Sequence, residues 1–240
     1  MDIFETWLVN IYIADGGLID NNTLENTLPA YKNAVTSGYA TLLDIQSLSD
    51  GTIICYKNSK LQSNTNKNGY VSNLTLQDIK EITLKDGNHI PTFEEALAVI
   101  NGKVPVIVNV VNNTLGNKFD SAVYKILKEY NGEYAICSAN PTTVQYYTER
   151  HPEIYTGIKV ENYTEKLDGS FKTKCLKKLK YNKACNPHFI MYYSDGLPTR
   201  YTRKYKSLPL IATDITTQEQ YLKAIKYSDN ITFNGFKPQI

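Results

Sequence analysis

Charged side chains stand at the carboxyl ends of several strands that the sequence predicts. An apolar, β-branched run at residues 9–14 ends in one acid, and a run at residues 189–193 is followed by another. Parallel α/β barrels build their sites from the loops at these strand ends. Four residues are therefore candidates for lining a pocket: Asp15, Lys57, Asp195 and Asp214.

Asp44 lies inside a predicted strand at residues 40–46. Two acids at positions i and i+2 of a strand point to one face, where they can converge on a hard cation such as Mg²⁺ or Ca²⁺. The residue two positions earlier is Leu42, so only half of such a pair is present. His89, His151 and His188 precede a helix, lie in a loop and begin a strand, and none is a candidate for proton transfer.

The elements that must position these residues alternate between strand and helix. Thr27 is a suitable N-cap for a helix with Pro29 in its first turn, and Gly38 ends that helix. Asp50-Gly51 predicts a hairpin. Further strands are predicted at 105–111, 134–138, 155–160, 189–193, 208–213 and 230–233, with helices at 75–82, 91–97, 119–130, 142–150, 171–181 and 217–227. Such alternation predicts parallel strands with crossover helices, and a count near eight favours a closed (β/α)8 barrel.

The composition is that of a soluble globular protein, with 42% hydrophobic and 21% charged residues among 240. This length suits one barrel domain over residues 1–240. A net charge of +2 is too small to indicate nucleic-acid binding. The sequence has neither an apolar run long enough to span a membrane nor the pattern of a secretion signal. We therefore expect a cytoplasmic protein.

Several motifs in sequence order resemble the glycerophosphodiester phosphodiesterase family, a phospholipase C-like variant of the TIM barrel. The match is strongest over residues 11–111 and rests on five pieces: Glu25-Asn26-Thr27-Leu28-Pro29, Ser49-Asp50-Gly51, Asn64-Thr65-Asn66-Lys67-Asn68-Gly69, Leu74-Thr75-Leu76-Gln77-Asp78-Ile79-Lys80 and Ile90-Pro91-Thr92-Phe93-Glu94-Glu95. The resemblance implies a phosphoric diester hydrolase fold and a place in lipid metabolism. Family members use two histidines as general base and acid and a divalent cation held by carboxylates.

At the positions that this resemblance assigns to the chemistry, the chain carries other residues. The two histidines align with Asp15 and Lys57, and we expect these to face each other as an ion pair. Alternatively, Lys57 binds an anion as a point charge, or the two act as base and acid. The last role suits them poorly, because the ordinary pKa values of a carboxyl and an amine, about 3.9 and 10.4, lie far from neutral pH. Of the metal carboxylates, two align with Leu42 and Asn109, which leaves Asp44.

The sequence thus predicts a non-catalytic relative of the family, with no active enzyme chemistry, whose barrel-mouth pocket binds a polyol-phosphate, a sugar or a protein partner. Ligand-binding candidates are Asp15, Glu25, Asp44, Lys57, Asn109, Asp195 and Asp214, although Glu25 could serve only to close the first loop. No cofactor is expected, and Asp44 is a weak candidate for a metal ligand. The alternative is a phosphoric diester hydrolase for glycerophosphodiesters with a remodelled site, which would use Mg²⁺ or Ca²⁺.

Overall fold

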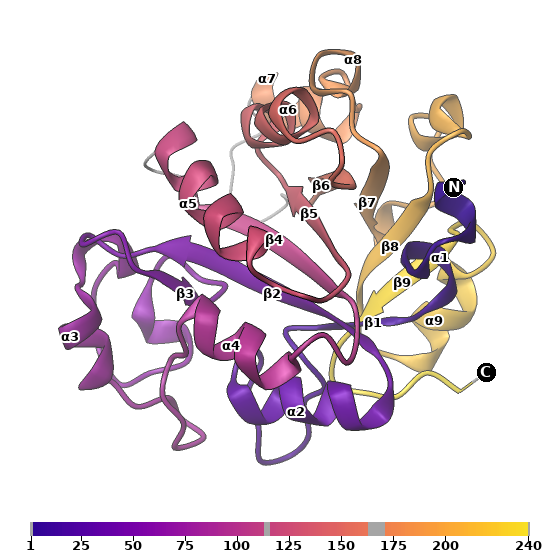
Figure 1. Cartoon of the computed structure of the whole chain (residues 1–240). Coiled ribbons are helices and arrows are strands. Elements are labelled where there is room, and N and C mark those ends of the chain that lie inside the picture. The colour runs from indigo at the N-terminus through magenta and orange to yellow at the C-terminus, as the bar shows by residue number, and fades with distance from the viewer. Residues whose placement is uncertain (1, 113–115, 163–170, 240) are drawn as a thin grey trace. The chain divides into compact units, whose positions relative to one another are not determined.

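The chain divides into two compact units. Figure 1 labels the helices and strands of both. The computed structural model describes residues 2–112, 116–162 and 171–239. Unit 2 is the continuous segment Ala14–Tyr134, and unit 1 combines Met1–Ile13 with Ala135–Ile240. The single domain over residues 1–240 stays a prediction.

Unit 2 contains parallel strands extended by a hairpin. Strand β2 (Ala40–Ser47) pairs in parallel with β4 (Val106–Asn112), which places Asp44 beside Asn109. It also pairs antiparallel with β3 (Ile53–Cys55), so the hairpin at Asp50-Gly51 is confirmed. Strand β1 (Ile13–Asp15) pairs with β2 as well. Strand β1 therefore ends in one acid, Asp15, and β2 carries a second, Asp44, within the strand.

The helices of unit 2 begin and end where the capping residues of the sequence require. In α2 (Leu28–Ser37) the Thr27 hydroxyl accepts a hydrogen bond from the Ala30 amide, and Gly38 takes a left-handed φ of 72°. Capping boxes open α3 (Leu76–Lys80) and α4 (Phe93–Ile100). Helix α5 (Asn117–Lys128) and the short 3₁₀ turns Leu61–Ser63 and Val71–Asn73 complete this unit.

Unit 1 contains a parallel sheet in which consecutive strands are neighbours. The order is β5 (Tyr134–Ser138), β6 (Thr156–Val160), β7 (Phe189–Tyr193), β8 (Leu210–Ile215) and β9 (Asn230–Phe233). The predicted strands at 134–138, 189–193 and 230–233 have the observed bounds. The predicted strand at 208–213 lies two residues too early.

The helices of unit 1 follow its strands, as the alternation predicts. They are α6 (Pro141–Arg150), α7 (Phe171–Lys177), α8 (Asn182–Cys185) and α9 (Gln218–Ala224), with 3₁₀ turns at Ile3–Glu5, Ser194–Gly196 and Thr202–Tyr205. The predicted strand at 9–14 is wrong in its first half, because Trp7–Asn10 form the short helix α1. A short apolar run fits a buried helix turn as well as a strand, and Trp7 and Leu8 are both buried there.

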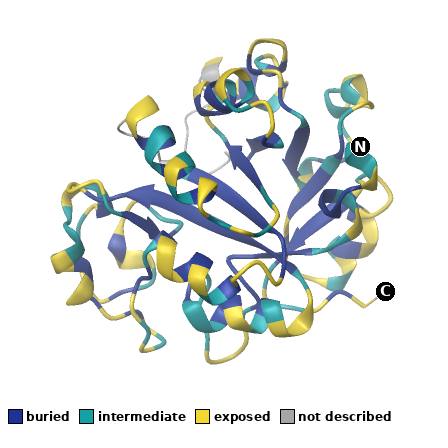
Figure 2. Cartoon of the chain, in the orientation of Figure 1, coloured by how far each residue is buried: buried dark blue, intermediate teal, exposed yellow. Residues whose placement is uncertain are grey.

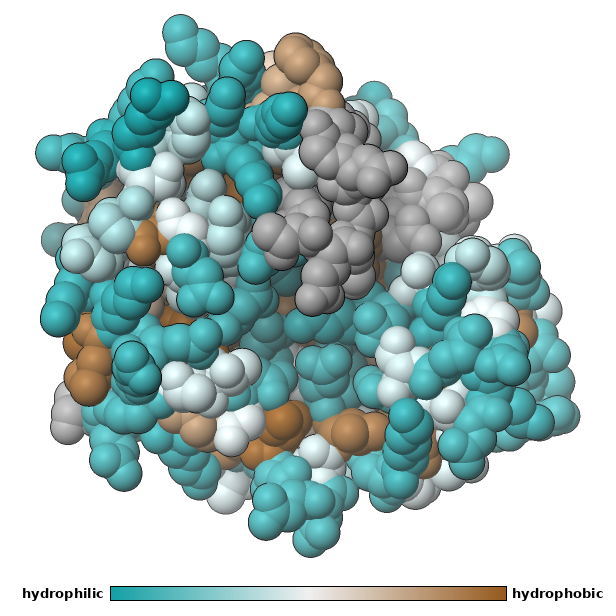
Figure 3. Space-filling view, turned by 180° about the vertical axis from the view of Figure 1, so that it is seen from behind, coloured by the Kyte–Doolittle hydropathy of each residue, from teal (hydrophilic) through white to brown (hydrophobic). Residues whose placement is uncertain are grey.

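The strands form the buried core of each unit, and the helices keep an exposed side (Figure 2). The surface visible in Figure 3 is mainly hydrophilic, with apolar side chains in small groups. In the described part of the chain, no helix has the length and apolar character needed to cross a membrane. The cytoplasmic location stays a prediction.

Candidate active site

Two glycines place the first candidate residues of unit 2 close together. The chain turns sharply after Asp15, where Gly16 and Gly17 adopt φ values of 71° and 88°. A Cβ atom at Gly17 would lie 2.6 Å from the backbone carbon of Ala30, so only glycine fits without displacement. The backbone N–H of Asn26 then donates to the Gly16 carbonyl at 2.7 Å. This turn brings residues 25 and 26 back beside the end of β1.

Lys57 lies between two carboxylates. Its Nζ atom is 3.7 Å from Oδ2 of Asp15 and 3.8 Å from Oε2 of Glu25. The Lys57 side chain is 33% exposed, whereas that of Asp15 is 5% exposed. The predicted ion pair between Asp15 and Lys57 is therefore confirmed, and Glu25 joins it. The cluster combines a cation that solvent or a ligand can reach with two acids that can accept protons.

Asp44 is buried and held by two asparagine side chains. The side-chain amide of Asn26 donates to Oδ2 of Asp44 at 3.0 Å, and the side-chain amide of Asn109 donates to Oδ1 of Asp44 at 2.6 Å. The Asn26 side-chain oxygen in turn accepts from the Asp44 backbone amide at 3.0 Å and from the Tyr31 hydroxyl at 2.9 Å. Burial raises the pKa of Tyr31, so its hydroxyl stays protonated and remains a donor. Both oxygens of the carboxylate are thus engaged by neutral donors.

These residues do not fit a divalent cation. The carboxylate oxygens of Asp44 face N–H donors, which repel a cation, and Leu42 at the i−2 position is a fully buried apolar side chain. Within the residues that the structure describes, no three His, Cys, Asp or Glu side chains are grouped as metal ligands. We therefore derive no chemical step through a metal. That the protein works without a cofactor stays a prediction.

The positions of the remaining predicted candidates are known only within unit 1. Asp195 is exposed in the 3₁₀ turn Ser194–Gly196. Asp214 is exposed within β8, with a left-handed φ of 62°. The structure brings together Asp15, Glu25 and Lys57 in one cluster and Asp44 with Asn109 in another. The roles of all seven candidates stay predictions.

Comparison with known proteins decides the family. The model of the Glycerophosphoryl diester phosphodiesterase family matches residues 17–195. The chain belongs to this family. A curated glycerophosphodiester phosphodiesterase from Caldanaerobacter subterraneus subsp. tengcongensis is 28% identical over 150 residues, which cover 57% of this chain and 61% of that relative's length. The resemblance that the motifs indicated is thereby confirmed.

Solved structures of glycerophosphodiester phosphodiesterases share the fold. A phosphodiesterase from Oleispira antarctica, solved with the product sn-glycerol-3-phosphate, superposes with a TM-score of 0.79 at 17% identity, covering 95% of this chain and 93% of that one. The Thermotoga maritima glycerophosphodiester phosphodiesterase gives a TM-score of 0.70 at 18% identity, with 93% of each chain covered. The predicted (β/α)8 barrel of phospholipase C-like architecture is confirmed.

The prediction that the chain is not an enzyme is wrong. The family and the similar structures are phosphodiesterases, one of them with its product bound. The prediction rested on the two missing histidines and on the two metal carboxylates that Leu42 and Asn109 replace. However, Asp15, Glu25 and Lys57 are themselves ionisable groups that can accept or donate protons, so the absence of histidine does not remove acid–base chemistry.

The sequence interpretation missed one residue that positions the lysine. Gln46 is buried, and its side-chain amide donates to the backbone carbonyls of Tyr56 and Asn58, the residues on either side of Lys57. It fixes the segment that carries the lysine. The available signal was its spacing, because Gln46 lies at i+2 from Asp44 and shares its face of β2.

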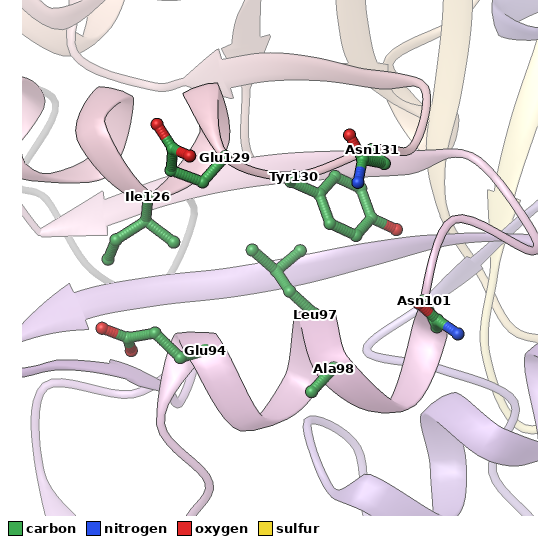
Figure 4. A pocket seen from close by; sticks show the side chains of 8 residues that line it. All are labelled: Glu94, Leu97, Ala98, Asn101, Ile126, Glu129, Tyr130 and Asn131. Carbon is green, nitrogen blue, oxygen red and sulfur yellow. The ribbon is translucent and has the colours of Figure 1, made fainter.

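A groove between α4 and α5 of unit 2 is separate from the candidate site residues. It has a volume of about 240 Å³, and Figure 4 shows Leu97 and Ile126 extending toward it from the two helices, with Glu94 and Glu129 at one end. The predicted site residues do not line it. The groove therefore does not contribute to the candidate active site.

Proposed function

We propose that the protein hydrolyses glycerophosphodiesters, releasing a polyol phosphate and an alcohol, with Lys57 as the cation of a remodelled active site. Membership in the phosphodiesterase family supports this activity. The role of Lys57 is inferred from one observation: its Nζ atom lies within 4 Å of the carboxylates of Asp15 and Glu25. An ammonium group contacts a phosphate oxygen as a point charge and opposes the negative charge that develops there.

The cluster contains both groups that hydrolysis of a phosphodiester requires. A water oxygen forms a bond to phosphorus, and its proton goes to a carboxylate of Asp15 or Glu25. The phosphorus–oxygen bond to the leaving alcohol breaks, and this oxygen takes a proton from the Lys57 ammonium. The carboxylic acid then returns its proton to the lysine amine, because the two groups form an ion pair in the resting protein. The cycle begins and ends with the same protonation.

The test is turnover of glycerophosphocholine by the purified chain, measured as released sn-glycerol 3-phosphate, with and without EDTA. We expect turnover that withstands EDTA and falls at least about 100-fold in Lys57→Met, the loss typical when one electrostatic contact to a transition state is removed. Lys67→Met, which changes an exposed lysine of the same segment, is the matched control. No product from the wild-type chain, or a Lys57→Met variant as active as wild type, would refute the proposal.

A further inference from the structure

Positive charge is concentrated in one segment of unit 1. Residues 171–206 contain ten lysines and arginines but a single acid, Asp195, so their formal charge is +9. The whole chain carries only +2, and the remaining residues are therefore net negative. Such an asymmetry indicates a negatively charged partner when the basic side chains share one surface.

Two hydrogen bonds bring separate parts of this segment together. The Tyr205 hydroxyl, at the end of the 3₁₀ turn Thr202–Tyr205, donates to the carbonyl of Leu179, just after α7, at 3.2 Å. The Tyr192 hydroxyl of β7 donates to the carbonyl of Lys177, the last residue of α7, at 3.0 Å. The end of α7 and the 3₁₀ turn are therefore neighbours, and β7 anchors the helix.

Tyr201 lies among cations from both parts. The Arg200 guanidinium donates to the Tyr201 hydroxyl at 3.2 Å. This hydrogen bond and the nearby positive charges of Lys178 and Lys204 lower the pKa of Tyr201 below its ordinary value. Lys178 directly follows α7, whereas Lys204 belongs to the 3₁₀ turn. The basic side chains of the two parts thus meet on one surface.

This surface is open to solvent and lacks acidic partners. We define the basic surface as the nine lysine and arginine side chains of residues 174–206. Eight of them are exposed, and that of Lys177 is half-buried. Among the residues that the structure describes, none of the nine forms an ion pair with an acid. Like charges gathered in this way repel one another, and an anionic partner relieves that repulsion.

A large apolar side chain lies beside these cations. Phe171, the first residue of α7, is 77% exposed, and Nζ of Lys180 lies 5.7 Å from the centre of its ring. An exposed phenyl ring bordered by lysines suits a membrane interface, where the ring enters the acyl region and the ammonium groups meet lipid phosphates. Seven of the nine cations are lysines, whereas arginine is the usual residue for recognising nucleic acids.

We propose that the basic surface and Phe171 bind the surface of a bilayer that contains anionic phospholipids. The cations supply attraction to the lipid headgroups, and the phenyl ring supplies apolar contact with the acyl chains. Such binding requires no turnover and does not depend on the proposed activity.

The experiment is cosedimentation of the whole chain with vesicles of equimolar phosphatidylcholine and phosphatidylglycerol, compared with phosphatidylcholine alone. We expect binding to the mixed vesicles that weakens as salt is added. Lys178→Gln/Lys204→Gln should weaken it roughly 30-fold, about fivefold for each charge removed. Lys223→Gln/Lys226→Gln is the matched control, because these exposed lysines lie in and just after α9, away from α7 and α8 (Figure 1). The control should bind as wild type does.

Two further variants separate the sources of binding. Phe171→Ala should bind the mixed vesicles about tenfold more weakly, because it loses the buried ring. Leu222→Ala, which removes a half-exposed apolar side chain of α9, is its control and should bind as wild type does. Lys57→Met should also bind as wild type does, which would exclude the candidate active site as the source.

Several results would overturn the proposal. They are the absence of salt-dependent binding to the mixed vesicles, equal binding by the two double variants, and equal binding by Phe171→Ala and Leu222→Ala. Binding of a single-stranded DNA oligonucleotide in preference to the mixed vesicles would overturn it as well. Vesicle binding by a chain without turnover would refute only the proposed activity, and turnover without vesicle binding would refute only this surface.

Discussion

Replacing Asn26 with alanine tests whether the asparagine holds Asp44 in place. The Asn26 side chain donates to the Asp44 carboxylate and accepts from both the Asp44 backbone amide and the Tyr31 hydroxyl. Asn26 is 2% exposed, and its φ of 57° lies in the left-handed region. Alanine would remove all three hydrogen bonds and would also fit this backbone conformation less well than asparagine.

The expected loss follows from the groups left without partners. Each buried donor or acceptor that loses its partner costs about 1 kcal/mol or more. The left-handed backbone adds about 1 kcal/mol for alanine. Asn26→Ala should therefore lower the free energy of unfolding by about 4 kcal/mol, a large share of the roughly 5–15 kcal/mol of a typical domain. At this chain length the Tm should fall by roughly 8–16 °C.

The assay is urea unfolding followed by circular dichroism, with linear extrapolation to water. Asn33→Ala is the matched control, because its amide bonds only the Leu18 carbonyl at 3.3 Å and the Asp20 carboxylate at 3.2 Å near the surface. The control should lose less than about 1 kcal/mol. If Asn26→Ala lost no more than Asn33→Ala, the hydrogen bonds around Asp44 would not stabilise the fold as argued.

Two further predictions concern the turn after β1 and the pH dependence of stability. Gly17→Ala should lower the free energy of unfolding, measured in urea, by about 3 kcal/mol, and Gly51→Ala by only about 1 kcal/mol. Both glycines have a left-handed φ, but of the two only Gly17 has a backbone atom in the way of a Cβ, at 2.6 Å. Equal losses in the two variants would contradict this. Burial lowers the pKa of His188 below its ordinary 6.5. The unfolded chain therefore binds this proton more readily, so Tm should fall as pH drops below about 6.5 and level off below the folded-state pKa. His188→Gln should weaken that fall, and an unchanged pH profile would exclude His188 as its source.

Local sequence signals determined most of the elements of this protein. Thr27 caps α2 and Gly38 ends it, because an N-cap hydroxyl and a left-handed residue act on their own helix end. The Asp50-Gly51 turn fixed the hairpin in the same way. The strand predicted at 9–14 was partly wrong, because a short apolar run does not specify its backbone conformation. Motif order identified the family, and Asp15 and Lys57 were recognised as partners.

Only the tertiary structure decided the surroundings of these residues. Glu25 joins Lys57 because the turn at Gly16 and Gly17 returns the chain to the end of β1. The hydrogen bonds of Asp44 depend on the register of β2 with β4, which sets Asn109 beside it. The basic surface likewise depends on the hydrogen bond from Tyr205 to Leu179, which brings two parts of unit 1 together. Such contacts join residues distant in sequence, so propensity and spacing predict the elements but not which side chains meet.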